Sequence, residues 1–151
     1  MKRLLHYLLP IALCFVVGGI SMIFQSEAIV EWYPTLDRPS ITPPNIVFPI
    51  VWSILYIFSG LSIGRLWDKG NRDYVGLWFL ILGLNFLWSP MFFFMESPIS
   101  GLVVILMLDI AVFSYTVITW PASRFASIIM IPYLAWLALA TYINFYIWLF
   151  N

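Results

Sequence analysis

A single acidic residue, Asp109, lies inside an otherwise apolar stretch of the sequence. It is about eleven residues into that stretch, which is roughly 16 Å along a helix. If the stretch crosses a membrane, a carboxylate at this depth costs several kcal/mol unless it is paired, hydrated or protonated. No Lys or Arg lies at a matching depth. We therefore expect Asp109 to be neutral or hydrogen-bonded, either lining a cavity or joining two helices.

Amides and indoles occupy comparable positions in the other apolar stretches. They are Asn85, Asn144, Trp52, Trp88 and Trp136. The tryptophans are too far from the ends of their stretches to form an interfacial belt. A buried indole N–H needs an acceptor, which the asparagines or Asp109 could provide. An apolar site lined by tryptophan, with few polar groups, would bind a flat and largely apolar molecule.

Five apolar stretches are long enough to hold these residues on transmembrane helices, each of which needs about 20 apolar residues. Their ranges are about 4–24, 45–66, 74–95, 98–119 and 125–150. The chain is 63% hydrophobic and 9% charged, whereas a soluble domain is roughly half apolar and about a quarter charged. Helices are favoured because the lipid bilayer cannot satisfy free backbone groups. The sequence predicts one all-α domain over residues 1–151, an integral membrane bundle of five transmembrane helices.

Basic residues gather at one end of this predicted bundle. That end carries Lys2, Arg3, Arg65, Lys69, Arg72 and Arg124, and the opposite end carries only Arg38. Short loops rich in Lys and Arg remain in the cytoplasm. We therefore expect a multi-pass protein with a cytoplasmic amino terminus and an external carboxyl terminus.

The longest connection, at about residues 25–44, contains both prolines and aromatic residues. Four prolines within residues 34–44 exclude a regular helix. Trp32 and Tyr33 make the loop apolar, unlike a solvated linker. We expect this outer loop to pack as a lid over the helix ends, rather than lie on the lipid surface.

Glycine and proline mark further positions in the predicted helices. Gly60 and Gly64 form a GxxxG pair, which allows another helix to approach closely, from the same chain or from a second copy. Each proline inside a predicted helix removes one backbone hydrogen bond and can kink the helix. The prolines in such positions are Pro10, Pro49, Pro90 and Pro132.

Several classes of function are disfavoured by composition. The net charge of zero argues against a nucleic-acid partner. Cys14 is the only cysteine, so no internal disulfide can form, and no Cys/His cluster predicts a metal site or a bound cofactor. No hydrolytic triad or nucleotide-binding loop is recognisable.

Three motifs resemble the translocator protein family (TspO/MBR, once called the peripheral benzodiazepine receptor) over about residues 15–148. The first is Trp32-Tyr33-x-x-Leu36-x-x-Pro39-Ser40-x-x-Pro43-Pro44, followed by Pro49-Ile50-Val51-Trp52 and Leu55-Tyr56. The second is Leu84-Asn85-x-x-Trp88-x-Pro90-x-Phe92-Phe93. The third is Pro132-Tyr133-Leu134-Ala135-Trp136-Leu137-Ala138, then Ala140-Thr141 and Asn144. Asp109 matches the family's acidic residue in the fourth helix.

The resemblance implies a loop folded over an internal pocket, a homodimer, and binding of porphyrins such as protoporphyrin IX and of benzodiazepine-type ligands. It implies that Trp52, Trp136, Asn85 and Ala140 line the pocket. Together with the residues placed by depth and by the lid, the predicted ligand-binding set is Trp32, Tyr33, Pro44, Trp52, Asn85, Trp88, Asp109, Trp136, Ala140 and Asn144.

Taken with the resemblance, these features predict a carrier or stress sensor for tetrapyrroles in a bacterial cell membrane. One alternative that the resemblance implies is an enzyme that degrades porphyrin with light and oxygen, in which Trp52 and Trp136 would be catalytic. Another is a regulatory membrane interaction protein. The only histidine, His6, lies at the basic end, far from the predicted pocket, so it cannot serve as an axial ligand to a haem iron bound there. This favours free-base porphyrin over axially ligated haem. No basic residue follows Tyr146, as the cholesterol motif of animal members requires, which argues against sterol binding.

Overall fold

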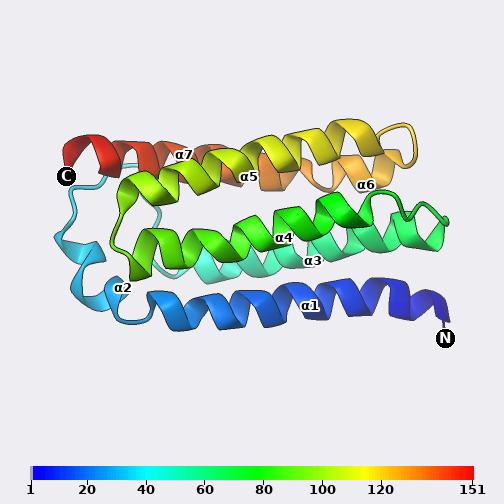
Figure 1. The fold of residues 1–151 in the computed structure, drawn as a ribbon, viewed down its shortest axis with the longest axis horizontal. Helices are drawn as coiled ribbons and strands as arrows, with labels where there is room; N and C mark the ends of the chain where they lie inside the picture. Colours follow the sequence, from blue (N-terminus) through cyan, green and yellow to red (C-terminus); the bar gives the residue numbers. More distant parts are fainter. Residues whose placement is uncertain (1) are drawn as a thin grey trace.

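The computed structural model describes residues 2–151 and confirms the all-α membrane bundle. Its long helices run alternately up and down along one axis (Figure 1); they are α1 (Lys2–Gln25), α3 (Val47–Asp68), α4 (Val75–Ser89), α5 (Pro98–Thr119) and α7 (Ile131–Phe150). Four short elements connect or extend them: α2 (Ala28–Glu31), the 3-10 turn η1 (Tyr33–Thr35), the π-helix η2 (Pro90–Phe94) and α6 (Arg124–Ile128).

Five helical segments of 20 to 27 residues are long and apolar enough to cross a membrane. At 1.5 Å per residue, even the shortest spans roughly the 30 Å hydrocarbon core. Large apolar side chains cover the outside of the bundle; Ile23 is 71% exposed and Ile110 is 67% exposed. An apolar surface of this extent suits lipid rather than water. The chain is therefore a multi-pass integral membrane protein.

The fifth span differs from the single helix that the sequence predicts over residues 125–150. It consists of α6 and α7, separated by a turn at Ile129 and Met130. Pro132 has no N–H and cannot donate to the carbonyl of Ile128. The Met130 N–H instead donates to the Ser127 carbonyl at 3.1 Å. The proline near the start of α7 thus accounts for the break.

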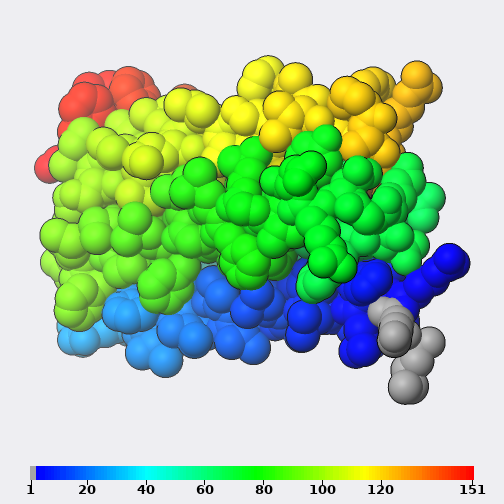
Figure 2. Space-filling model, turned by 45° about the vertical axis from the view of Figure 1, so that its right-hand side comes forward, coloured from blue at the N-terminus to red at the C-terminus, as the bar shows by residue number. Residues whose placement is uncertain are grey.

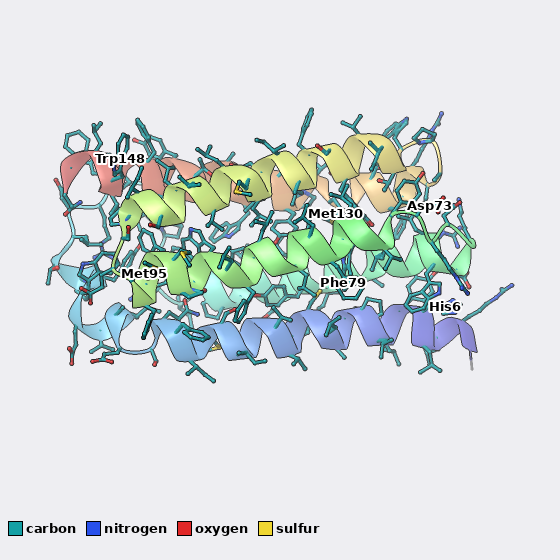
Figure 3. All side chains as sticks on the ribbon, in the orientation of Figure 1. His6, Asp73, Phe79, Met95, Met130 and Trp148 are labelled. Carbon is teal, nitrogen blue, oxygen red and sulfur yellow. The ribbon has the colours of Figure 1, made fainter. Side chains whose placement is uncertain are left out.

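The bundle has two chemically different ends. The basic end contains the start of α1 and the connections 69–74 and 120–123, and the lid end contains α2, η1, residues 36–46 and the end of α7. Figure 3 shows His6 and Asp73 at one end and Met95 and Trp148 at the other. That the basic end faces the cytoplasm stays a prediction, which rests on the concentration of Lys and Arg at that end.

The GxxxG pair packs within the chain. A Cβ atom added at Gly64 would lie 2.7 Å from the carbonyl oxygen of His6, and one at Gly60 would lie 2.8 Å from the Cα atom of Ile11. Both neighbours belong to α1. The two glycines therefore allow the backbones of α1 and α3 to approach closely, so this face is occupied within one chain.

Helix α3 begins farther from the lid end than the ends of α5 and α7 that lie there (Figure 1). The segment 36–46 runs from η1 past the end of α7 to Val47, where α3 begins. Non-helical backbone therefore lies between the start of α3 and the lid-end surface of the bundle.

Candidate ligand-binding site

Aromatic side chains from α3 and α7 meet between the two helices. The Trp52 and Tyr133 rings lie edge to face with centroids 5.9 Å apart, and those of Phe48 and Trp136 do so at 5.5 Å. Phe48 and Trp52 are one turn apart on α3, while Tyr133 and Trp136 are three residues apart on α7, so each pair shares a helix face. We call these four residues the aromatic cluster. It contains both tryptophans that the resemblance assigns to a pocket.

Asn85 brings a polar group from α4 to the aromatic cluster. Its side-chain amide donates a hydrogen bond to the Tyr133 hydroxyl, and the residue is buried. Ala140 lies one helical turn beyond Trp136 on α7 and is packed against the core. The structure thus brings together, around α7, the four residues that sequence resemblance assigns to a pocket; their contact with a ligand stays a prediction.

The Trp136 indole N–H is the unusual group in this cluster. Its Nε1 atom is buried and has no hydrogen-bond partner among the described residues. By contrast, the Trp78 indole donates to the Ser59 hydroxyl at 2.9 Å. A buried donor without an acceptor costs about 1–3 kcal/mol. A ligand that offers an acceptor at this position would recover that free energy.

Asn144 joins three helices through its side-chain amide. Its oxygen accepts from the Trp88 indole N–H at 3.1 Å, and its nitrogen donates to the Pro98 carbonyl at 2.8 Å. The residue is 1% exposed. The expected pairing of a deep indole with an asparagine is therefore present, and both polar atoms of Asn144 are bound to the protein itself.

Asp109 forms a hydrogen bond between α5 and α7. The Thr141 hydroxyl donates to its Oδ2 atom at 2.6 Å, and the residue is half-buried. Thr141 thus supplies a hydrogen bond to Asp109, one of the states expected from the sequence. In this arrangement Asp109 joins two helices.

We expect Thr141→Val to lower the free energy of unfolding by about 1 kcal/mol, because it removes an interhelical hydrogen bond inside the membrane. In an Asp109→Leu background the same change should have almost no effect, since its acceptor is gone. Thr116→Val is the matched control, because Thr116 donates only to Val112 of its own helix. Reversible unfolding in mixed micelles measures the stabilities of all five proteins. Equal losses from Thr141→Val in both backgrounds would contradict the assignment.

The lid packs on the end of α4 through a second group of aromatic rings. Tyr33 is 7% exposed and lies 5.7 Å from Phe93, and Trp32 lies 5.4 Å from Phe92. Phe92 also stacks on Trp88 at 5.2 Å. The π-helix η2 presents Phe92 and Phe93 side by side. The predicted residues Trp32, Tyr33 and Trp88 therefore meet here, apart from the aromatic cluster.

Two further contacts hold the lid. The Arg38 guanidinium lies over the Tyr33 ring, with its Cζ atom 4.7 Å from the ring centre. Burial raises the pKa of the Tyr33 phenol, and the charge of Arg38 opposes this effect. The Asp37 N–H donates to Oδ1 of Asn151 at 2.9 Å, and Nδ2 of Asn151 donates back to the Asp37 carbonyl at 3.1 Å. Asn151 therefore ties the lid to the end of α7.

Pro44 lies on the lid rather than in the aromatic cluster. It is exposed and helps to line a cavity of about 490 Å³, together with Leu36, Arg38, Pro39, Thr42, Pro43 and Asn45. Phe48 follows it by one turn of chain and reaches Trp136. Phe48 is absent from the binding set predicted from the sequence, although its spacing from Trp52 could have indicated a shared helix face.

A bundle of five membrane-spanning helices with an aromatic interior beneath a packed loop places this chain among small multi-pass membrane proteins. The chain belongs to the TspO/MBR family, whose family model matches residues 10–149.

Three relatives illustrate the similarity. Tryptophan-rich protein TspO of Archaeoglobus fulgidus is 38% identical over 138 residues, which cover 89% of this chain and 90% of that protein. Translocator protein of Homo sapiens is 34% identical over 125 residues, 79% of this chain and 74% of its own. Tryptophan-rich sensory protein of Cereibacter sphaeroides is 31% identical over 116 residues, 76% and 73% of the two chains.

Proposed function

We propose that this protein binds a flat, largely apolar tetrapyrrole such as protoporphyrin IX between α3 and α7, and acts as a membrane carrier or sensor. The observation that carries the proposal is the buried Trp136 N–H without an acceptor, within a cluster of four aromatic side chains. The names of two relatives, a translocator protein and a sensory protein, support a carrier or sensor role.

The aromatic cluster can provide a macrocycle with aromatic rings on which to stack and with one hydrogen-bond donor. Trp52 and Phe48 can stack on a π-system, where aromatic pairs add about 0.5–1.5 kcal/mol beyond area burial. The Trp136 N–H can donate to an oxygen at the polar edge of the ligand. In the structure the Phe48 ring packs against Trp136, so entry of a macrocycle requires these two rings to separate.

The test is a tryptophan-fluorescence titration of the purified protein with protoporphyrin IX in the dark. Trp136→Phe retains an aromatic ring but removes the N–H, so we expect roughly tenfold weaker binding from the loss of one buried hydrogen bond. The free protein should be no less stable, because the substitution also removes an unsatisfied donor. Trp52→Phe should weaken binding through a smaller stacking surface.

Trp148→Phe is the matched control, because it removes one indole from an exposed position at the lid end. It should leave the midpoint of the titration unchanged. Quenching that does not saturate, or that has the same midpoint in all four proteins, would overturn the proposal. Repeating the titration under light tests the enzymatic alternative; we expect binding without multiple turnovers of porphyrin.

A further inference from the structure

A second cavity lies at the basic end, far from the aromatic cluster. Its volume is about 470 Å³, and it is lined by Arg65, Lys69, Trp120, Pro121, Ala122, Ser123, Arg124 and Phe125. Three of these residues are cations, and none is an acid. In Figure 2, where the basic end is turned forward, the yellow-to-orange connection after α5 projects above the green connection between α3 and α4.

Within the part of the chain that the structure describes, no carboxylate lies within 4 Å of the three cations of this cavity. Among the described residues, Asp68 pairs with Arg3 at 3.7 Å, and the His6 imidazole of α1 also lies 3.7 Å from its carboxylate. Lys69 is held over the cavity because its Nζ atom donates to the Ala122 carbonyl at 3.0 Å. Like charges that line one cavity repel one another, so an anion bound between them would be stabilised.

Beneath the cavity, a network of buried hydrogen bonds fixes α6 against α3 and α5. The Ser62 hydroxyl donates to the Ala126 carbonyl at 2.7 Å and lies 3.0 Å from the Tyr115 hydroxyl. The Thr119 and Ser127 hydroxyls are 2.8 Å apart. All five residues are completely buried. The walls of the cavity are therefore held in place before any ligand arrives, which lowers the cost of binding.

The rim of the cavity indicates where it opens. Trp120 is 45% exposed and Phe125 is 52% exposed, and the Arg124 guanidinium lies 5.9 Å from the centre of the Trp120 ring. Exposed tryptophan at the end of a transmembrane helix marks the boundary between lipid and water. The cavity thus opens at the level where phospholipid headgroups lie.

We propose that this cavity binds the phosphate group of an anionic phospholipid. Arg65 and Arg124 present planar guanidinium groups that can each hold two phosphate oxygens, and Lys69 adds a third charge. Basic pockets between transmembrane helices suit such headgroups. The acyl chains would lie along Trp120 and Phe125. This inference does not depend on the proposed tetrapyrrole site.

The test compares retention of dioleoyl phosphatidylglycerol and dioleoyl phosphatidylcholine by native mass spectrometry of the protein in a neutral detergent. We expect a clear preference for phosphatidylglycerol. Arg65→Gln with Arg124→Gln should weaken its binding about 25-fold, at about fivefold for each cation removed. The same two positions changed to Lys should retain most of the affinity, because the charges remain.

The matched control is Arg3→Gln with Arg72→Gln, which removes two charges from the same end outside the cavity. It should change the affinity by less than about twofold. Circular dichroism and gel filtration establish that each variant is folded. Equal weakening by both pairs of substitutions, or retention of both lipids alike, would overturn the proposal.

A competition arm distinguishes a lipid from a soluble anion. If the cavity holds a headgroup at the bilayer surface, millimolar inorganic phosphate should not displace phosphatidylglycerol. Displacement by inorganic phosphate, together with a rise in thermal stability that Arg65→Gln and Arg124→Gln abolish, would assign the cavity to a soluble phosphate and overturn the lipid assignment.

Discussion

Gly64→Ala is expected to lower the free energy of unfolding by roughly 1–3 kcal/mol, although a single methyl group is added. The new Cβ would lie 2.7 Å from the His6 carbonyl oxygen and 3.0 Å from the Cα atom of Tyr7. Both neighbours are backbone atoms, which cannot move aside as a flexible side chain can. Helices α1 and α3 would have to separate along their contact. Unfolding of the purified protein in mixed micelles, followed by circular dichroism, measures the loss.

Gly19→Ala provides the control for this prediction. A Cβ at Gly19 would meet nothing within 4 Å, and the residue lies inside α1, more than one turn from its end at Gln25. There alanine should be neutral or stabilising by up to about 1 kcal/mol, because glycine is the poorer helix former. If Gly64→Ala dissociated a dimer without changing the stability of the monomer, the glycine pair would instead belong to an interface between copies.

Asn144→Leu should have the second large effect on stability. Leucine is similar in size but leaves the Trp88 N–H without its acceptor and removes the bond that joins Asn144 to the Pro98 carbonyl of α5. Interhelical hydrogen bonds in membranes are worth about 0.6 kcal/mol on average and up to about 1.7, so we expect a total loss of about 1–3 kcal/mol. Unfolding in mixed micelles again gives the value.

A double-mutant cycle isolates the pair within this network. In a Trp88→Phe background the donor is absent, so Asn144→Leu should cost less there than in the original protein. The difference gives the coupling between the two side chains. Strictly additive losses would show that the hydrogen bond between Trp88 and Asn144 contributes nothing measurable.

The spans were predictable because lipid imposes a length and a composition on any helix that crosses it. The same rule says nothing of how each helix is rotated about its axis. The sequence therefore indicated that Gly60 and Gly64 could pack closely, but not that their neighbour is α1. The break between α6 and α7 depends on Pro132, whose effect in a membrane helix varies with the partners available nearby.

The candidate site was predictable in its residue types and less so in its pairings. Few polar groups exist at membrane depth, so an acceptor for Trp88 had to be among them, and Asn144 is that acceptor. Asp109 pairs with Thr141, a residue too common in helices to be singled out from sequence. That Trp136 has no acceptor depends on side-chain positions of neighbouring helices, which no pattern in its own segment encodes.

The position at which α3 begins, set back from the lid end, has a consequence for how a ligand could be exchanged. Residues 36–46 cover that position without a ladder of backbone hydrogen bonds, and Pro39, Pro43 and Pro44 have no N–H group that needs an acceptor. Displacing this segment therefore unwinds no helix. It breaks the two hydrogen bonds between Asp37 and Asn151 and the contact of the Arg38 guanidinium with the Tyr33 ring. The cover of the bundle can thus move as a stiff, donor-poor flap while every membrane-spanning helix stays intact.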